Sequence, residues 1–452
     1  MYHIFTMKTL IKTLEGFAIA PPVVLTPILL ALLYASYRIV PEFVEATFRS
    51  IFVLSPIWLP VVFVIVFWKI WVPYIRSYLE FYGQEKILLE VRIPREVVKS
   101  PLAMETIITN LHAGFGETSF IDRYVTGKTR AWFSLEIVSI EGEIHFYIWT
   151  RKFLKNFIEA QIYGQYPDME VKEVNDYASE FSYDKEKYSL FGCDLQLTDL
   201  DAYPIKTYVD YGLSDDPKEE LKVDPMSGFF EFLSKMGPGE QIWLQMIIRV
   251  NKGDRPEDKI FKPGFPFGTT TTWKDEAKSE IEKIRKEATP EVPDFNDPTK
   301  VTRGFPNPTP GQVEKLKAID RTLGKIPFDT GMRVIYLAKK DNFNGANIPS
   351  LLLSFRQLSA PNHNSIGPVR WHIMFDYPWQ DFRGLREERM RRRLADAYRR
   401  RAWFHSPYKT KSFIMSAEEL ATIFHFPGAV SEAPSLPRIT SRRGEAPANL
   451  PT

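Results

Sequence analysis

The chain begins with two long apolar segments that flank a short polar one. Residues 17–37 and residues 50–68 contain no charged side chain, and residues 38–49 separate them. An α-helix rises 1.5 Å per residue, so about 20 apolar residues span a hydrocarbon core of about 30 Å. The pattern therefore predicts a transmembrane helical hairpin over residues 17–75, preceded by an N-terminal cytoplasmic segment at residues 1–16. A pair of helices buried in a soluble core is the alternative interpretation.

The flanks of the two segments predict the orientation of the hairpin. Tyr34 and Tyr37 end the first segment, and Trp68 and Trp71 end the second, as in the aromatic belts of membrane interfaces. Basic residues are slightly denser before and after the hairpin than in its loop, which favours both ends in the cytoplasm. The protein is therefore expected to be multi-pass, with the bulk of the chain cytoplasmic.

Beyond the hairpin, apolar residues alternate with polar ones. The pattern predicts strands over residues 86–94, 131–140, 143–150 and 169–174, and helices over residues 100–112 and 152–166. Glu141 and Gly142 form a tight turn between the two middle strands. The order strand, helix, strand, strand, helix, strand is that of a ferredoxin-like domain, expected here over residues 85–177.

A second α+β region is expected over residues 187–375. Its strands are predicted at residues 188–198, 205–211, 241–250 and 332–338, and its helices at 225–236 and 348–358. A Pro-rich insertion over residues 251–328 contains two further helices, at 274–287 and 311–323. The region is either a second ferredoxin-like module or part of a single extended α+β domain. The predicted fold class is thus α+β with a transmembrane hairpin and one or two ferredoxin-like (βαββαβ) modules.

A basic helix is predicted over residues 383–404, where arginines surround a narrow apolar stripe. Arginine is suited to bidentate contact with phosphates and carboxylates. Three interpretations stay open: contact with nucleic acid, contact with anionic lipid, or contact with an acidic partner or solvent alone. The predicted contact residues are Arg386, Arg389, Arg391, Arg392, Arg393, Arg399, Arg400 and Arg401.

The last predicted region, residues 412–452, starts with a short helix. Ser416 and Glu419 have the spacing of a capping box, Pro427 and Gly428 end the helix, and a Pro-rich extended tail follows. We interpret this region as a docking segment for a partner, whose contact residues are Glu418, Glu419, Phe424, His425, Phe426 and Pro427.

The sequence offers no catalytic motif. It contains no GxxxxGK[ST] phosphate loop, and its seven histidines are not paired at metal-ligand spacing. The single cysteine, Cys193, excludes an internal disulfide and a cysteine-based zinc site. No enzyme activity, metal or cofactor is predicted.

Several stretches resemble a known family. The region that precedes the motor domain in conjugative-transfer ATPases of the HerA/FtsK superfamily resembles three stretches of this chain: SPLAMETIITNLHAGFG, AWFSLEIVSIEGEIHFYIWT and FIEAQIYGQYPDMEVKEVNDY. Similar stretches also occur in membrane-anchored companions from Patescibacteria-type bacteria. FIMSAEELATIFHFPG and LPRITSRRGEAPANLP are similar to the segment that leads into the motor of those proteins. The motor itself is not part of the sequence, so the resemblance implies an adaptor role and no ATPase activity.

Together, these features predict a non-enzymatic adaptor in the bacterial inner (cytoplasmic) membrane, within a type IV secretion or conjugation-like apparatus. Its expected partners are the lipid bilayer and a separate HerA/FtsK-type ATPase, with DNA, anionic lipid or a second copy of the chain as further candidates. The alternative function is a membrane-tethered nucleic-acid-binding protein that uses the Arg-rich helix.

Overall fold

The computed structural model describes residues 21–94, 99–112, 116–117, 119–213, 223–252, 272–289, 291–293, 301–303, 305–370, 379 and 381–427. The predicted N-terminal segment and the predicted tail from Ala429 onward lie outside this part of the chain. The chain divides into two compact units. One comprises Met1–Tyr74 and Met374–Leu385, and the other comprises Ile75–Ile373 and Arg386–Thr452.

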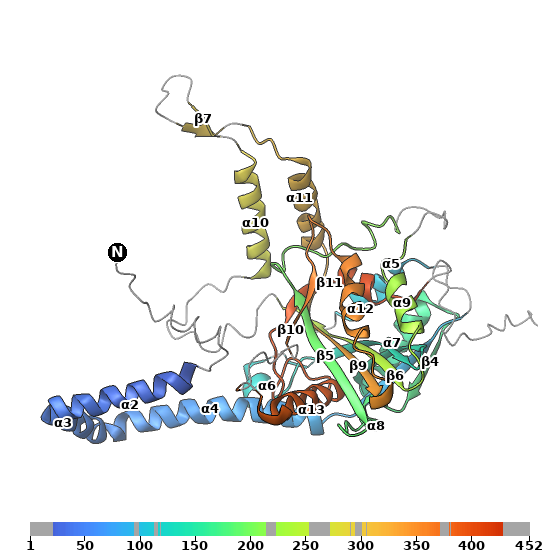
Figure 1. Cartoon of the computed structure of the whole chain (residues 1–452). Helices are drawn as coiled ribbons and strands as arrows, with labels where there is room; N and C mark the ends of the chain where they lie inside the picture. The colour runs from blue at the N-terminus through green and yellow to red at the C-terminus, as the bar shows by residue number, and fades with distance from the viewer. Residues whose placement is uncertain are drawn as a thin grey trace, which may run out of the picture. The chain divides into compact units, whose positions relative to one another are not determined.

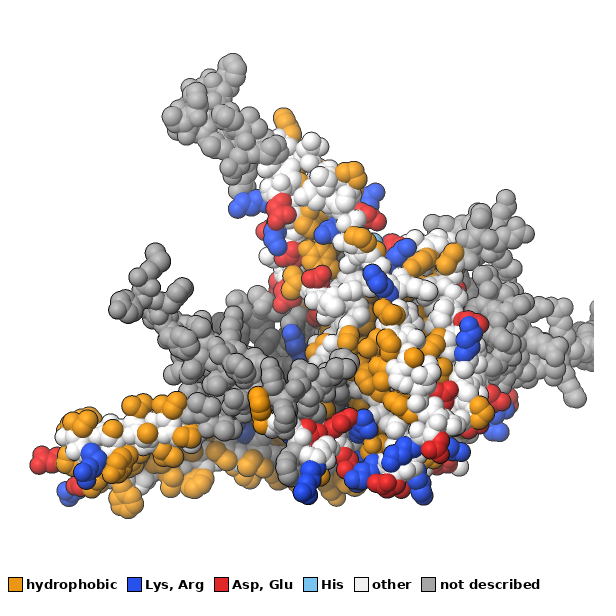
Figure 2. All heavy atoms as spheres, viewed as in Figure 1, with side chains coloured by type: hydrophobic (Ala, Val, Ile, Leu, Met, Phe, Trp, Pro, Cys, Tyr) orange, Lys and Arg blue, Asp and Glu red, His pale blue; other side chains and the backbone are white. Residues whose placement is uncertain are grey.

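Three helices account for the apolar start of the chain: α2 (Pro21–Ile39), α3 (Pro41–Val53) and α4 (Ser55–Tyr82). The prediction of a loop at residues 38–49 is wrong, because most of these residues belong to α3. Pro41 opens α3 and Glu42 lies in its first turn, both of which favour a helix start. Apolar side chains lie exposed along this segment, and charged side chains gather at the end where α3 lies (Figure 2).

Length and composition make one of these helices a candidate membrane span. The stretch Ser55–Glu80 of α4 is long and apolar enough to cross a bilayer. Thr26–Ile39 and Pro41–Val53 meet at an angle of 115°, and pass the same test only when the bent pair is taken as one span.

Nine strands of the described chain form one antiparallel sheet, in the order β10-β5-β9-β6-β2-β3-β1-β4 with β11 paired to β9 (Figure 1). Their bounds are β1 Lys86–Arg92, β2 Trp132–Ile140, β3 Glu143–Arg151, β4 Glu170–Val174, β5 Tyr188–Leu197, β6 Glu240–Val250, β9 Pro327–Lys339, β10 Ile366–Arg370 and β11 Phe413–Ser416.

The sheet repeats one strand order in its two halves. The first half runs β2-β3-β1-β4 and the second runs β6-β9-β5-β10, so corresponding strands occupy corresponding places. The halves join through β2 and β6, where Glu136 lies opposite Gln245. The two α+β regions therefore share one continuous sheet.

Most of the strands match the sequence pattern, with two exceptions. The tight turn between β2 and β3 is confirmed, because Glu141 and Gly142 both have positive φ, as a two-residue hairpin turn requires. The strand predicted at residues 205–211 is wrong: the Asp210 carboxylate accepts a hydrogen bond from the backbone N–H of Thr207 at 2.9 Å, within a turn. The sequence pattern did not predict strands β10 and β11.

Helices cover both faces of the sheet. One face packs against α5 (Pro101–Asn110), α7 (Lys155–Gln165), α9 (Ser227–Ser234), α12 (Asn347–Leu353) and α14 (Ala417–Ile423). The other face is covered by α8 (Tyr177–Glu180), by α13 (Leu385–Arg399) and by Trp403 and Phe404. A short helix, α6 (Phe120–Tyr124), lies between α5 and β2 in the chain.

The insertion between β6 and β9 has its own small core. Helices α10 (Trp273–Glu287) and α11 (Pro310–Leu323) carry the two-stranded pair β7 (Glu291–Pro293) and β8 (Val301–Arg303). The two helices lie side by side (Figure 1), and Ala277, Ile284 and Ile319 are buried in one cluster together with Ala202. Both helices were predicted from the sequence, and each starts with a capping box.

The close approach of Trp403 to the middle of β9 generates the first prediction. A Cβ added to Gly331 would lie 2.2 Å from the Trp403 ring, so Gly331→Ala must displace the indole. We expect this change to lower the free energy of unfolding by about 1–3 kcal/mol. Gly345→Ala is the matched control, because a Cβ at Gly345 meets no atom within 4 Å. Urea denaturation of the detergent-solubilised protein checks both; equal stability of the two variants would contradict the packing described.

Candidate functional site

Helix α13 carries the predicted basic surface, but its arginines have different environments. Arg386, Arg389, Arg392, Arg393 and Arg399 are exposed, whereas Arg391 and Arg400 are half-buried. Some are neutralised within the helix: Arg391 pairs with Glu387, and Arg392 lies 2.6 Å from Glu388. Arg389 and Arg393 form no ion pair within the described residues. The basic character available to a partner therefore concentrates at Arg389 and Arg393, one helical turn apart.

Arg401 is not a surface contact, which corrects the prediction for this residue. Its side chain is fully buried and binds two carboxylates: Nε lies 2.9 Å from Glu136 Oε1, and Nη2 lies 2.8 Å from Asp176 Oδ1. Burial alone would raise the pKa of Asp176, but the charge and hydrogen bonds of Arg401 hold it below its ordinary value. Arg401 thus links the end of α13 to β2 and to the segment after β4.

The backbone at Arg401 has a conformation that is uncommon for a residue other than glycine. The residue has φ of 49°, a left-handed conformation that favours glycine. Its N–H donates to Tyr398 O, and the N–H of Ala402 donates to Ala397 O, the hydrogen-bond pattern of a Schellman helix end. An arginine occupies the usual glycine position because its guanidinium is needed by Glu136 and Asp176.

Three more buried arginines lie on this face of the sheet, each with a carboxylate and an aromatic ring. Arg151 lies 2.6 Å from Glu80 and beside Trp132, Arg249 lies 2.8 Å from Asp329 and beside Phe404, and Arg333 lies 2.7 Å from Asp194 and beside Trp403. We call these three pairs and the Arg401 pair the buried arginine layer. Such pairs are costly to break, because each broken pair leaves an uncompensated buried charge.

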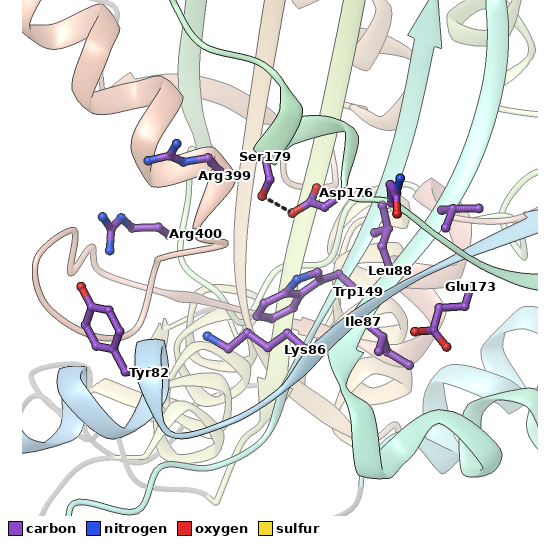
Figure 3. Close-up of a pocket in the computed structure, with 12 residues that line it drawn as sticks. Tyr82, Lys86, Ile87, Leu88, Trp149, Glu173, Asp176, Ser179, Arg399 and Arg400 are labelled. Atoms are coloured by element: carbon purple, nitrogen blue, oxygen red, sulfur yellow. Dashed lines mark hydrogen bonds between the residues drawn. The ribbon is translucent and has the colours of Figure 1, made fainter.

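A cleft of about 590 Å³ opens beside this layer, between the end of α4, strands β1 and β4, and the end of α13. We call it the β1–α13 cleft. Its lining residues are Tyr82, Lys86, Ile87, Leu88, Trp149, Glu173, Val174, Asn175, Asp176, Ser179, Arg399 and Arg400. Figure 3 shows Lys86 reaching past the Trp149 ring toward the side where Tyr82 and Arg400 lie. Its ammonium lies 5.3 Å from the centre of the Trp149 ring, a cation–π contact.

The cleft is electropositive at its α13 side. Arg399 and Arg400 both bind one carboxylate, Asp396, at 2.7 and 2.9 Å. Burial lowers the pKa of Lys86; Glu80 opposes the shift, whereas the neighbouring charges of Arg151, Arg401 and Arg400 add to it. Two of the predicted contact residues, Arg399 and Arg400, therefore come together with Lys86, which sequence reasoning did not select.

The predicted docking segment lies in the core. Glu418, Glu419, Phe424, His425 and Phe426 are all at most 3% exposed, and Pro427 is buried as well. The capping box between Ser416 and Glu419 is confirmed, but it faces inward: Glu419 also accepts a hydrogen bond from the backbone N–H of Ile205 at 3.1 Å. These side chains are not available to a separate protein, because they are buried in the core, where α14 packs against α5.

Charged groups in this segment are matched by partners within the chain. Glu418 accepts a hydrogen bond from Thr207 and pairs with Arg321 at 3.1 Å. Burial raises the pKa of Glu419 to about 7, although its hydrogen bonds to Ser416 oppose the shift. Both ring nitrogens of His425 face acceptors, with Nε2 at 3.2 Å from Asp224 and Nδ1 at 3.1 Å from the carbonyls of Ala421 and Thr422. The protonated imidazolium fits this site.

Sequence reasoning missed Glu136, Asp194, Arg249, Asp329 and Arg333. Each is a charged residue within a strand, and all of them except Asp329, which Thr330 follows, have an apolar residue on both sides in the sequence. That pattern was a usable signal, because a strand that is buried on both faces leaves such a charge no route to solvent. No three His, Cys, Asp or Glu side chains in the described part of the chain are placed to hold a metal ion.

Comparison with known proteins identifies the sheet-forming part of the chain. A family model described as "Domain of unknown function (DUF8128)" matches residues 80–436. The chain belongs to the DUF8128 family. The DUF8128 region begins at Glu80, the partner of Arg151, and includes the nine-stranded sheet, the insertion and the buried C-terminal segment.

The other comparisons add no function. No curated protein matches the chain. A solved structure, "Berberine bridge enzyme G164A variant, a reticuline dehydrogenase", is similar at 11% identity and a TM-score of 0.21, over 76% of this chain and 55% of that one. The match spans little more than half of that enzyme, and its TM-score is too low to support a shared fold or activity.

The Arg401 pair generates the second prediction. Arg401→Leu leaves the buried Glu136 and the half-buried Asp176 without their cation, so we expect a loss of about 3–5 kcal/mol in unfolding free energy. Arg401→Gly suits the left-handed backbone but also removes the charge, and it should be destabilised as well. Arg392→Ala, on the exposed face of α13, should change stability by less than about 1 kcal/mol. Urea denaturation measures all three; a stable Arg401→Gly variant would show that the backbone, not the charge, limits stability.

His425 generates the third prediction. Burial alone would lower its pKa, but Asp224 and the two carbonyls raise it above the ordinary value. A raised histidine pKa stabilises the fold fully below the unfolded value of about 6.5, and this contribution is lost as pH rises through the folded value. Wild-type stability should therefore fall as pH rises above about 6.5 and through the raised folded pKa of His425. His425→Gln should flatten this slope, and an unchanged slope would exclude His425 as its origin. Urea midpoints measured across the pH range decide between these results.

Proposed function

We propose that the chain is a membrane-anchored, non-enzymatic adaptor of a type IV secretion or conjugation-like apparatus, which docks a separate ATPase of the HerA/FtsK type. The observation that carries the proposal is helix α4. Its first part presents exposed apolar side chains, and its last part holds Glu80, which is buried in an ion pair with Arg151 of β3. An anchor helix that ends inside a folded domain is what an adaptor requires.

The anchor that we propose is a helical hairpin in the bacterial inner membrane, with the DUF8128 region in the cytoplasm. Support comes from the charge-free residues 50–68 and from the exposure of apolar side chains in both α2 and α4. Prolines inside these helices, Pro27, Pro60 and Pro73, are tolerated better in membranes than in soluble helices.

We further propose that the DUF8128 region consists of two ferredoxin-like modules fused edge to edge. Strand order supports this: in each half the first strand lies between the third and the fourth, and the second lies beyond the third. Helices α5 and α7 of the first half, and α9 and α12 of the second, pack on the same face of the sheet. Fusion through β2 and β6 covers one edge of each module, which protects it from unwanted strand pairing.

The docking surface that we propose is the exposed face of α13 around Arg389 and Arg393, because the C-terminal segment is buried. Exposed, unpaired guanidinium groups favour an acidic partner face and accelerate its encounter. A truncation at Pro407 would delete β11 and α14 from the core, so it would test folding instead of docking. Charge reversal on α13 leaves the core intact.

The fourth prediction concerns this surface. Arg389→Glu with Arg393→Glu should lower the recovery of a HerA/FtsK-type ATPase, in a pull-down of the full-length protein from native membranes, about tenfold or more. Lys274→Glu with Lys278→Glu is the matched control: it reverses the same charge, at the same spacing, on the exposed face of α10.

The outcomes separate the two functions. Loss of the ATPase with the α13 variant alone supports the adaptor. Recovery of no such ATPase with the wild type contradicts it. DNA binding with steep salt dependence, lost in the α13 variant and kept in the α10 variant, would instead favour the membrane-tethered nucleic-acid-binding protein.

A further inference from the structure

We propose that α3 lies in the plane of the membrane, at the boundary between lipid headgroups and acyl chains, where it joins α2 to α4. This inference rests on the proposed membrane anchor and names the part of the bilayer that α3 contacts. Its support comes from the position, the surface pattern and the hydrogen bonds of α3, all within the unit that contains Met1–Tyr74.

The chain turns sharply between α2 and α3. At 1.5 Å per residue, the 19 residues of α2 are about 28 Å long, close to the hydrocarbon thickness of about 30 Å. Val40 then leaves the helical conformation, with φ of −137° and ψ of 68°, because Pro41 disfavours the α region for the residue before it. Pro41–Val53 is turned by 115° from Thr26–Ile39, closer to a right angle than to a continuation or a reversal. A span that ends at Ile39 therefore leaves α3 at the surface of the bilayer.

The surface of α3 is amphipathic. Glu42, Glu45 and Arg49 follow one another at the spacing i, i+3, i+7, so their charged side chains lie on one side of the helix. The large apolar side chains cover the other sides: Phe43, Val44, Phe48, Ile51 and Phe52. All of α3 is described and none of it is buried; its three phenylalanines are 55–78% exposed. A helix with one charged side and exposed aromatic side chains elsewhere is the type that lies flat in a membrane interface.

The uncharged polar side chains of α3 need no water. The hydroxyls of Thr47 and Ser50 each donate a hydrogen bond to the carbonyl four residues earlier, at 2.7 and 2.8 Å. The indole N–H of Trp58, near the start of α4, donates to Ile51 O at 3.0 Å and so links the two helices. Polar groups that are satisfied within the chain can face hydrocarbon at little cost. Apart from its charged side, α3 can therefore lie against acyl chains.

The surroundings of α3 favour lipid over a protein partner. Exposed apolar side chains of α2 and α4 continue into those of α3, and charged side chains gather only at the α3 end of this segment in the view of Figure 2. A groove of about 430 Å³ at the corner between α3 and α4 contains no charged residue. Its lining residues are Phe43, Ala46, Thr47, Ser50, Ile51, Leu54 and Trp58. Acyl chains match such a groove, because it offers apolar contact alone.

The experiment measures the depth of single cysteines in the full-length protein, reconstituted into vesicles of phosphatidylethanolamine and phosphatidylglycerol. Glu45→Cys reports on the charged side of α3, Phe48→Cys on its apolar side, and Val64→Cys on α4. All three side chains are exposed, so the changes should leave the fold intact. The native Cys193 is fully buried, and burial raises the pKa of its thiol to about 12, so it should react little with a maleimide fluorophore.

Quenchers in the water and on the lipid chains then locate each fluorophore. We expect iodide in the water to quench Glu45→Cys, and a spin label about 5–10 Å below the headgroups to quench Phe48→Cys. Val64→Cys should be quenched by a spin label near the bilayer centre, about 15 Å deep. Glu45→Cys and Phe48→Cys are a matched pair, since they lie three residues apart on the same helix.

The outcomes separate this inference from the anchor on which it rests. Quenching of Val64→Cys by iodide would contradict the anchor itself, and the interfacial helix with it. Where Val64→Cys is deep, three results overturn the interfacial helix alone. Iodide quenching of Phe48→Cys places the whole of α3 in water, and deep quenching at both α3 positions makes it a re-entrant helix. Protection of Phe48→Cys from every quencher means that protein, such as a second copy of the chain, covers it.

Discussion

The fold depends on a layer of buried arginines on one face of the sheet. Arg151, Arg249, Arg333 and Arg401 each bind a carboxylate and lie beside an aromatic ring. A buried ion pair adds little stability compared with apolar packing, but a broken one is costly. The layer therefore specifies which segments must come together, because every wrong arrangement leaves a charge unpaired.

The segments that the layer joins are far apart in the sequence. Arg401 follows α13 and binds Glu136 in β2, whereas Glu80 in α4 binds Arg151 at the end of β3. The sheet is thus connected on one face both to α4, whose first part is apolar and exposed, and to α13, which carries the basic row. Apolar packing of α5, α7, α9, α12 and α14 covers the other face, where the chain has no need of ion pairs.

Function is left to the charges that this architecture does not neutralise. Burial removes Arg401 and the C-terminal segment from any contact surface, and local pairing neutralises Arg391 and Arg392. The exposed pair Arg389 and Arg393 remains, with no ion pair among the described residues. The proposed adaptor would use this pair for a protein partner.

The sequence by itself determined the apolar start of the chain, the strands β2, β3, β6 and β9, and the two helices of the insertion between β6 and β9. These elements follow from local periodicity, turn chemistry and capping residues. The sequence did not determine β11, which has four residues, or β10, in which Gly367 and Pro368 interrupt the strand pattern. It also placed Arg401 and Glu418 on the surface, since charge normally indicates exposure. Only the tertiary structure decided otherwise, because burial of a charge depends on a partner such as Glu136 or Thr207, and residues 265 and 211 positions apart show no local pattern.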